Sequence, residues 1–322
     1  MDFGFSIPTR GILATREAAL ALAKCGESAG FDYLAIPDHI VIPRRIDSPY
    51  PYNAQRKMVG ASDGDCLEQL VLMSFLAAAT SRIRLLTSVM VVPHRPVMLA
   101  AKALATIDVL SGGRVTVGCG AGWMEEEFVA LAAPPFAERG RVTDDYLRAF
   151  KQLWTQDDPR FDGAHARFSD IAFLPKPIQQ PHPPLWIGGE SPAALRRAVA
   201  LGDAWYPIGS NPQFPLDTLE RYERGIAALK ETAQRSGRDP STIELSYWAS
   251  WYNEKHGAQT IDGQRQLFTG DDADVANDIR AFERLGVRHL LFNFVRASLS
   301  ESIAAVERFA TCLLYTSDAA DE

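Results

Sequence analysis

Short runs of apolar residues alternate with longer segments of helical period along the chain. Eight runs have the length and the β-branched or aromatic content of buried strands: 3–7, 33–36, 83–92, 114–119, 185–187, 204–208, 243–249 and 289–295. Two intervening helices also have clear boundaries, because Thr15 can cap one helix that Gly30 ends, and Gly112-Gly113 end another. Eight alternating units predict an α/β fold, a parallel (β/α)8 TIM barrel rather than an open sheet.

Two long departures interrupt this alternation. The first is the Pro- and Tyr-rich stretch 43–65, and the second is 125–184, which contains a predicted helix around 143–154. Both come directly after a strand, so both are expected as insertions on the carboxyl face of the barrel, where such enzymes keep their sites. We find no internal repeat and no low-complexity linker, and we therefore predict one domain over residues 1–311.

The last residues, 312–322, read CLLYTSDAADE and follow neither a helical nor a strand period. They resemble the translation of a sequencing-library adapter. We therefore expect a non-native tail from Cys312 onward.

Composition narrows the classes of partner. The chain has 322 residues, 47% of them hydrophobic, and a formal charge of −7, so we expect no nucleic-acid partner. Its longest apolar stretch is too short for a bilayer and its start lacks a secretory pattern, so we expect no membrane partner and a cytoplasmic location. The cysteines have no metal or disulfide spacing, which fits a reducing compartment: Cys25, Cys66, Cys119 and Cys312.

The stretch YLAIPDHIVIP breaks an apolar strand at Pro37 and places an acid and an imidazole directly after it. Proline removes a ladder donor, so Asp38 and His39 should stand just past the carboxyl end of the second strand. On a barrel this is the catalytic face. The alternative is a turn aspartate beside a surface histidine.

The strand ends lack the groups of two common barrel chemistries. A divalent ion needs several His or carboxylate ligands in one place, and no His-x-His pair occurs. Schiff-base chemistry needs a lysine inside the barrel, and no predicted strand contains one. We therefore predict no metal.

Two strands contain unusual residues. Thr87-Ser88 interrupts the apolar third strand, which predicts either a bulge facing a ligand or hydroxyls satisfied by nearby carbonyls. The fourth strand leads into GCGAGW, whose glycines would let a flat ring approach the backbone, with Trp123 as a possible wall. A dinucleotide fingerprint is disfavoured, since its third glycine would fall on Trp123. The run 125–127 of glutamates suits a helix start as well as a site.

After the fifth strand, Gly188-Gly189 precedes Ser191 and Pro192. This order predicts a strand, a tight turn and a helix N-terminus, whose amides would bind a phosphate. Capping alone is the competing explanation for Ser191.

Four blocks together resemble the luciferase-like monooxygenase family, more closely its coenzyme F420-dependent oxidoreductases: GFDYLAIPDHIVIP, the long block from IRLLTS to GWMEEEF, FAERGRVTDDYLRAFKQLW and PPLWIGGESPAALRRAVALGDAWYP. The resemblance implies a luciferase-like TIM barrel and residue roles. His39 would be the catalytic acid/base or would hold the substrate, and a non-prolyl cis peptide would fall at Ser88-Val89. The implied cofactor-binding residues are Asp38, Ser88, Val89, Ala121, Gly122, Gly188, Gly189 and Ser191. Trp123 stands where sugar-phosphate dehydrogenases of this branch have a catalytic glutamate, so sugar-phosphate oxidation is disfavoured.

The resulting hypothesis is hydride transfer between F420 and a small organic substrate, with His39 moving the proton. A first alternative keeps the fold and uses reduced FMN with oxygen as a monooxygenase. A second alternative is a non-catalytic flavin-binding protein. The resemblance also implies a homodimer.

Overall fold

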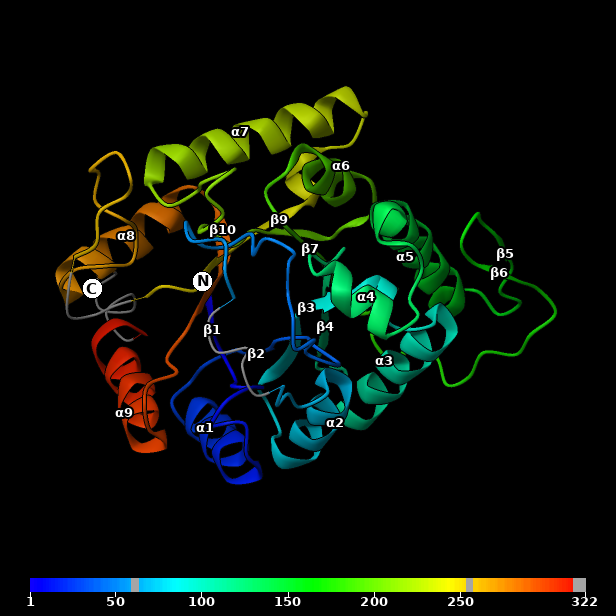
Figure 1. Ribbon diagram of the computed structural model, residues 1–322, viewed down its shortest axis with the longest axis horizontal. Coiled ribbons are helices and arrows are strands. Elements are labelled where there is room, and N and C mark those ends of the chain that lie inside the picture. Colours follow the sequence, from blue (N-terminus) through cyan, green and yellow to red (C-terminus); the bar gives the residue numbers. More distant parts are fainter. Residues whose placement is uncertain (59–63, 253–256, 315–322) are drawn as a thin grey trace.

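The computed structural model describes residues 1–58, 64–252 and 257–314. Eight parallel strands close into a barrel in the order β1-β10-β9-β8-β7-β4-β3-β2, with helices around it (Figure 1). The strands are β1 (Asp2–Ser6), β2 (Tyr33–Ile36), β3 (Arg84–Val91), β4 (Val115–Gly120), β7 (Leu185–Gly188), β8 (Ala204–Tyr206), β9 (Glu244–Ala249) and β10 (Val287–Phe292). The predicted TIM barrel is confirmed, and each predicted apolar run supplies one strand.

The helices that the described residues form are α1 (Arg16–Ser28), α2 (Gln69–Ala79), α3 (Val97–Ser111), α4 (Glu125–Ala130), α5 (Arg139–Thr155), α6 (Pro192–Leu201), α7 (Leu219–Arg235), α8 (Asp272–Arg284) and α9 (Leu299–Phe309). Short turns of helix are η1 (Val92–His94), η2 (Phe136–Glu138), η3 (Pro240–Thr242) and the π-helical η4 (Ala310–Leu314). A small antiparallel hairpin, β5 (Phe161–Asp162) with β6 (Arg167–Phe168), projects from the barrel at the right of Figure 1.

Local sequence fixes several boundaries as expected. The Thr15 hydroxyl accepts a hydrogen bond from the Ala18 amide at 3.1 Å and starts α1. Gly112 takes a left-handed conformation, with φ of 70°, and ends α3. β10 stops at Phe292, before the predicted residue 295, because the Val295 amide bonds to the Asn293 side chain and closes a turn.

Side chains that alternate along the strands build two separate cores. One lies between the barrel and its helices, and the other fills the barrel interior. The interior cluster consists of Tyr33, Ala35, Leu86, Trp186, Ala204, Tyr206 and Leu291, with Val89 and Trp248 partly buried against it.

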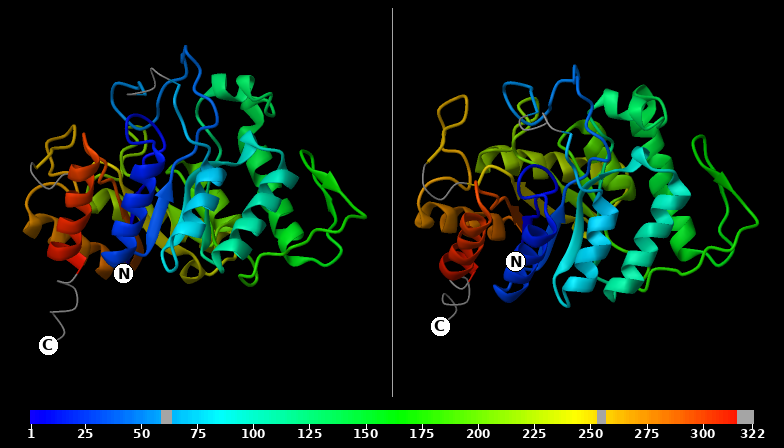
Figure 2. Two further views of the ribbon diagram at one scale, coloured as in Figure 1. Left: turned by 90° about the horizontal axis from the view of Figure 1, so that it is seen from below. Right: turned by 60° about the horizontal axis from the view of Figure 1, so that its bottom comes forward.

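The expected place on the carboxyl face is wrong for the later part of the second insertion, because Gln179 Nε2 donates at 2.7 Å to the carbonyl of Val115, the first residue of β4. The segment after β2 and the start of the second insertion do stand together at one end of the barrel. Figure 2 shows the segment after β2 and the helix α4 rising at that same end. This is the carboxyl face, since both segments follow strand carboxyl ends. No helix in the described part of the chain is both long and apolar enough to cross a bilayer.

The predicted non-native tail begins inside η4, where Cys312 packs partly against the outer core. Residues 315–322 of that tail lie outside the described residues. The tail assignment therefore stays a prediction.

An ionic cluster closes the opposite, amino-terminal end. His289 is buried and its Nδ1 lies 2.9 Å from Asp2 Oδ2, while its Nε2 lies 3.1 Å from Glu244 Oε2. Its ring also packs on Trp186, with centroids 4.4 Å apart. Burial opposes a charge on His289, but the two carboxylates outweigh it and raise its pKa.

This cluster should make stability depend on pH. A histidine whose pKa is raised by folding stabilises fully below its unfolded pKa of about 6.5, and that contribution is lost as pH rises through the folded pKa. The melting temperature of the wild type should therefore exceed that of His289→Gln most at pH 6 and progressively less toward pH 9. Differential scanning calorimetry across this range measures it. A difference that is constant with pH would contradict the charged pairing.

Candidate active site

His39 lies just past the carboxyl end of β2 and is held by a buried carboxylate. Its Nδ1 is 2.7 Å from Glu127 Oε2, and the Ile40 and Val41 amides donate to Glu127 Oε1 at 2.8 and 3.3 Å. The Glu127 side chain is 1% exposed and that of His39 12% exposed. The structure thus confirms that His39 lies at the end of a strand. The hydrogen bond to Glu127 holds its ring in one orientation.

The electrostatics of this pair fix the direction of the hydrogen bond. Burial opposes the charge on Glu127, yet His39, the nearby His94 and the Ile40 amide hold its pKa below the ordinary value. An ionised carboxylate only accepts, so Nδ1 of His39 donates. In a neutral ring Nε2 is then the basic nitrogen, which is the arrangement of a general base.

Asp38 faces the other way. Its carboxylate has no exposed surface. It accepts hydrogen bonds from both terminal nitrogens of Arg95 at 2.8 Å and from the Val91 amide at 2.9 Å. Arg95 also pairs with Glu68, at the start of α2. These donors occupy both oxygens of Asp38, so its side chain anchors the end of β3; the predicted cofactor contact stays a prediction.

The third strand contains the expected irregularity. The pairing of β3 with β4 shifts register between Thr87 and Met90, and the Ser88-Val89 peptide bond is cis. The Thr87 hydroxyl donates to the Gly118 carbonyl at 2.8 Å, and Ser88 Oγ lies 2.9 Å from Tyr206 Oη. The bulge and the cis bond are confirmed, and the hydroxyls are satisfied as well.

Val89, projecting from this bulge, packs over two glycines on neighbouring strands. A Cβ added at Gly120 would come within 2.6 Å of Val89 Cγ2, and one added at Gly188 within 3.0 Å of Val89 Cγ1. We call Val89, Gly120 and Gly188 the Val89 shelf. It brings Val89 of β3 and Gly188 of β7, both predicted cofactor-binding residues, together.

The remaining predicted glycines adopt backbone conformations that favour glycine. Gly122, beside Ala121, has φ of 86°, and a Cβ there would meet Val91 and Phe128 at 2.7 Å. Gly189 has φ of 101° and opens the turn into α6. Ser191 caps that helix, accepting from the Ala194 amide at 3.2 Å. The strand, turn and helix are confirmed; the phosphate role is a separate prediction.

An aromatic cluster joins the two insertions. Trp123 packs edge-on against Tyr50, and Tyr50 against Tyr52, with ring centroids 5.1 and 5.5 Å apart. Glu126 Oε1 accepts from the Asp47 and Ser48 amides at 2.7 and 2.9 Å. Trp123 is therefore a contact between the segments after β2 and β4, at the same face as His39.

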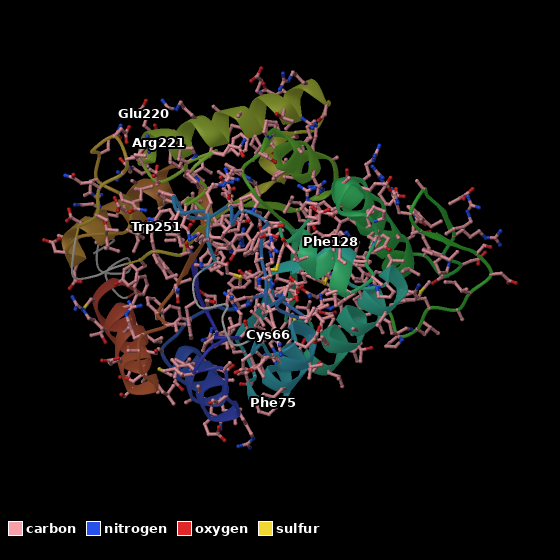
Figure 3. All side chains as sticks on the ribbon, in the orientation of Figure 1. Cys66, Phe75, Phe128, Glu220, Arg221 and Trp251 are labelled. Atoms are coloured by element: carbon pink, nitrogen blue, oxygen red, sulfur yellow. The ribbon has the colours of Figure 1, made fainter. Side chains whose placement is uncertain are left out.

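Sequence reasoning missed several residues of this face. The sequence does not distinguish Glu127 from its two neighbouring glutamates. His94 is not among the predicted site residues, yet its buried ring packs on Phe128, a residue of α4 labelled in Figure 3. Trp248 is also not among the predicted site residues; it packs against the interior cluster, and its Nε1 is buried without a hydrogen-bond partner among the described residues.

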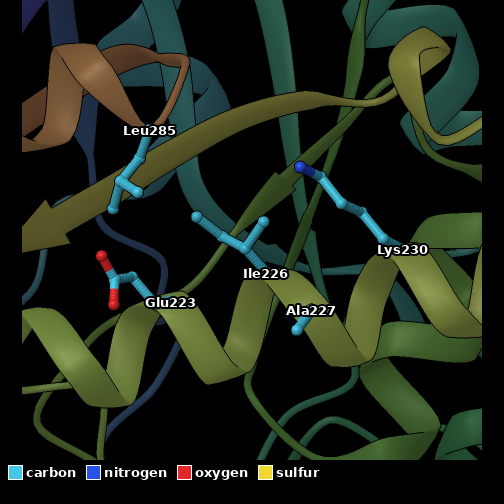
Figure 4. A pocket seen from close by; sticks show the side chains of 5 residues that line it. All are labelled: Glu223, Ile226, Ala227, Lys230 and Leu285. Atoms are coloured by element: carbon cyan, nitrogen blue, oxygen red, sulfur yellow. The ribbon is translucent and has the colours of Figure 1, made fainter.

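The described residues contain no group of three or more His, Cys, Asp or Glu side chains that could hold a metal ion. An open surface pocket on α7, with Leu285 across from it, contains none of the predicted residues (Figure 4).

Comparison with known proteins decides the family. The family model described as luciferase-like monooxygenase matches residues 1–252. The chain belongs to the luciferase-like monooxygenase family. The predicted resemblance is thus confirmed, and it relates the chain to a family of oxidoreductases and monooxygenases.

The proteins similar to this luciferase-like chain include one named as FMNH2-dependent and one named as F420-dependent. An uncharacterized protein of Mycobacterium tuberculosis is 31% identical over 317 residues, covering 97% of this chain and 99% of the relative. An FMNH2-dependent dimethylsulfone monooxygenase of Pseudomonas putida is 37% identical over 172 residues, covering 53% and 47%. The coenzyme F420-dependent tetrahydromethanopterin reductase of Methanopyrus kandleri shares the fold, with a TM-score of 0.73, 15% identity and coverage of 98% and 99%.

The buried pair of Asp38 with Arg95 generates a stability prediction. Asp38→Ala would leave Arg95 desolvated and only partly paired, so the free energy of unfolding should fall by about 3–5 kcal/mol. Chemical denaturation measures it. Asp47→Ala is the matched control: its pair with Arg45 is exposed and should contribute less than about 1 kcal/mol. Unchanged stability in Asp38→Ala, with loss of cofactor binding, would assign Asp38 to the ligand instead.

Proposed function

We propose that this protein is a coenzyme F420-dependent oxidoreductase that transfers a hydride between the deazaflavin and a small organic substrate. The observation that supports this best is the orientation of His39 by the buried Glu127 at the end of β2. A held imidazole on the same face as the Val89 shelf provides a proton donor or acceptor beside a surface suited to a flat ring.

The residues present fit such a cofactor. Val89 fills the space where a Cβ would stand at Gly120 and crowds that position at Gly188, so its methyl groups would form the surface on which a planar ring lies. Ser88 supports the bulge through Tyr206, and Ala121 with Gly122 would contact the ring and its ribityl chain. Gly189 and the start of α6 at Ser191 would receive the phosphate. When bound, the deazaflavin would supply hydride exchange at its C5 carbon.

The chain itself would supply proton transfer, orientation and exclusion of water. Glu127 holds Nδ1 of His39, so the proton would enter or leave at Nε2. His39 would thus give a proton to a substrate being reduced, or take one from a substrate being oxidised. The aromatic cluster of Tyr50, Tyr52 and Trp123 would cover the reacting groups from the two insertions.

A second candidate is an FMN-dependent monooxygenase. The similarity to the dimethylsulfone monooxygenase of Pseudomonas putida, which uses FMNH2, favours it. Both cofactors carry a tricyclic ring and a phosphate, so Gly188 and Gly189 would serve either one.

A fluorescence titration with each cofactor tests the proposal. We expect saturable binding of F420 to the purified protein and weaker binding of FMN. His39→Ala should bind F420 within a few fold of the wild type, because the ring rests on the Val89 shelf, while hydride transfer is strongly depressed. Tight FMN binding without F420 binding would instead select the monooxygenase. Stopped-flow hydride transfer at the wild-type rate in His39→Ala would remove His39 from the chemistry.

We also propose a homodimer formed through α2 and α3. These neighbouring helices expose large apolar side chains: Val71 and Phe75 on α2, and Leu99, Val109 and Leu110 on α3. Phe75 lies at the outer edge of the molecule in Figure 3. Apolar surface gathered on adjacent helices is typical of an interface that a second copy covers.

Light scattering after size exclusion tests the dimer. The double variant Val71→Glu with Leu99→Glu places charges on both helices and should convert a dimer to a monomer. Ile261→Glu is the control, since Ile261 is fully exposed and lies outside both helices. A monomeric wild type, or a dimer that survives both substitutions, would contradict this interface.

A further inference from the structure

Arg10 occupies the carboxyl face next to His39. It follows β1, which pairs directly with β2. The Leu67 amide donates to the Thr9 carbonyl at 2.9 Å, and Arg10 itself forms an isolated antiparallel bridge with Cys66. Cys66, labelled in Figure 3, donates in turn to the Ile40 carbonyl at 3.5 Å. The backbone around Arg10 is thus fixed against the segment that holds His39.

The side chain of Arg10 is unusual among the arginines that the structure describes. Its Nη1 is buried and has no hydrogen-bond partner within the described residues. Arg95 and Arg114, which are more buried than Arg10, are fully engaged: Arg95 by Asp38 and Glu68, and Arg114 by carbonyls and Thr80. Packing therefore satisfies these two buried guanidinium groups, whereas the partly exposed Arg10 keeps one buried donor without a partner among the described residues.

A buried guanidinium nitrogen without a partner is unfavourable, because its donors lose their hydrogen bonds to water. Burial lowers the pKa of Arg10, while Tyr50, Cys66 and Glu127 act in the opposite direction. These neighbours place the guanidinium within electrostatic reach of the carboxylate that orients His39. Arg10, His39 and the aromatic cluster therefore border one region of the carboxyl face.

We propose that Arg10 binds a carboxylate of the substrate, so that the protein acts on small organic acids. The inference rests on the proposed function for the identity of the reacting group near His39. A carboxylate matches the planar fork of the guanidinium and would supply the missing acceptor for Nη1. A single negative charge also suits the site better than a doubly charged phosphate, because the ionised Glu127 lies nearby.

Calorimetric titration of the full chain, without cofactor, tests this recognition. The probes are acetate, butyrate, benzoate and phenylacetate, each compared with its neutral amide, and inorganic phosphate. At least one carboxylate should bind the wild type about tenfold or more tightly than it binds Arg10→Met, because the variant removes a charge-assisted pair. The amides should bind both proteins with equal affinity, and the affinity for phosphate should not depend on Arg10. Arg16→Met is the matched control, since that arginine begins α1 and is exposed.

A second measurement separates recognition from a structural role. If Arg10 serves to bind a ligand, Arg10→Met should melt at or above the temperature of the wild type, because it removes a buried donor that has no partner among the described residues. A clearly lower melting temperature would overturn the proposal, as would carboxylate binding that is absent or independent of Arg10. Since no cofactor is present, these outcomes are distinguishable from a failure of F420 to bind.

Discussion

The buried charge of Glu127 is the constraint on which the carboxyl face depends. An ionised carboxylate out of water is stable only when donors surround it. Here the donors are the His39 ring and the amides of Ile40 and Val41, all from the segment after β2, while Glu127 itself belongs to α4. Displacing either segment would leave the charge unpaired. The same requirement that joins two elements therefore also fixes the orientation of His39.

The neighbouring Asp38 extends this arrangement in the opposite direction. Its carboxylate binds Arg95 and the Val91 amide, at the end of β3. Two consecutive side chains thus connect the end of β2 to different parts of the barrel, one toward β3 and one toward α4. Pro37 ends the strand just before them, so that both can leave the regular ladder.

Much of this architecture could be predicted from the sequence, because its causes are local. An apolar run such as 33–36 can be satisfied only inside the sheet, and a polar break at Thr87-Ser88 in such a run indicates an irregular strand. Gly112 and Ser191 mark helix ends through their own backbone or hydroxyl chemistry. The bounds of β10 were less accurate, since Asn293 closes a turn that apolar periodicity does not reveal.

The partners of charged groups could not be predicted in this way. All three glutamates at the start of α4 suit the positive end of a helix, and only the rotation of that helix selects Glu127 as the buried one. The same holds for the arginines: nothing local to Arg95 or Arg10 indicates that, among the described residues, the first pairs with two carboxylates and the second with none. These pairings arise from tertiary packing between segments far apart in the chain.

The contacts between the two insertions have a consequence for how such barrels diversify. Tyr50 packs on Trp123, and Glu126 accepts hydrogen bonds from the amides of Asp47 and Ser48. Each insertion therefore supplies contacts that the other needs. If one loop alone were exchanged between homologues, it would lose its contacts with the other insertion. Recombination, in nature or in the laboratory, therefore has to transfer both insertions as a single inherited unit.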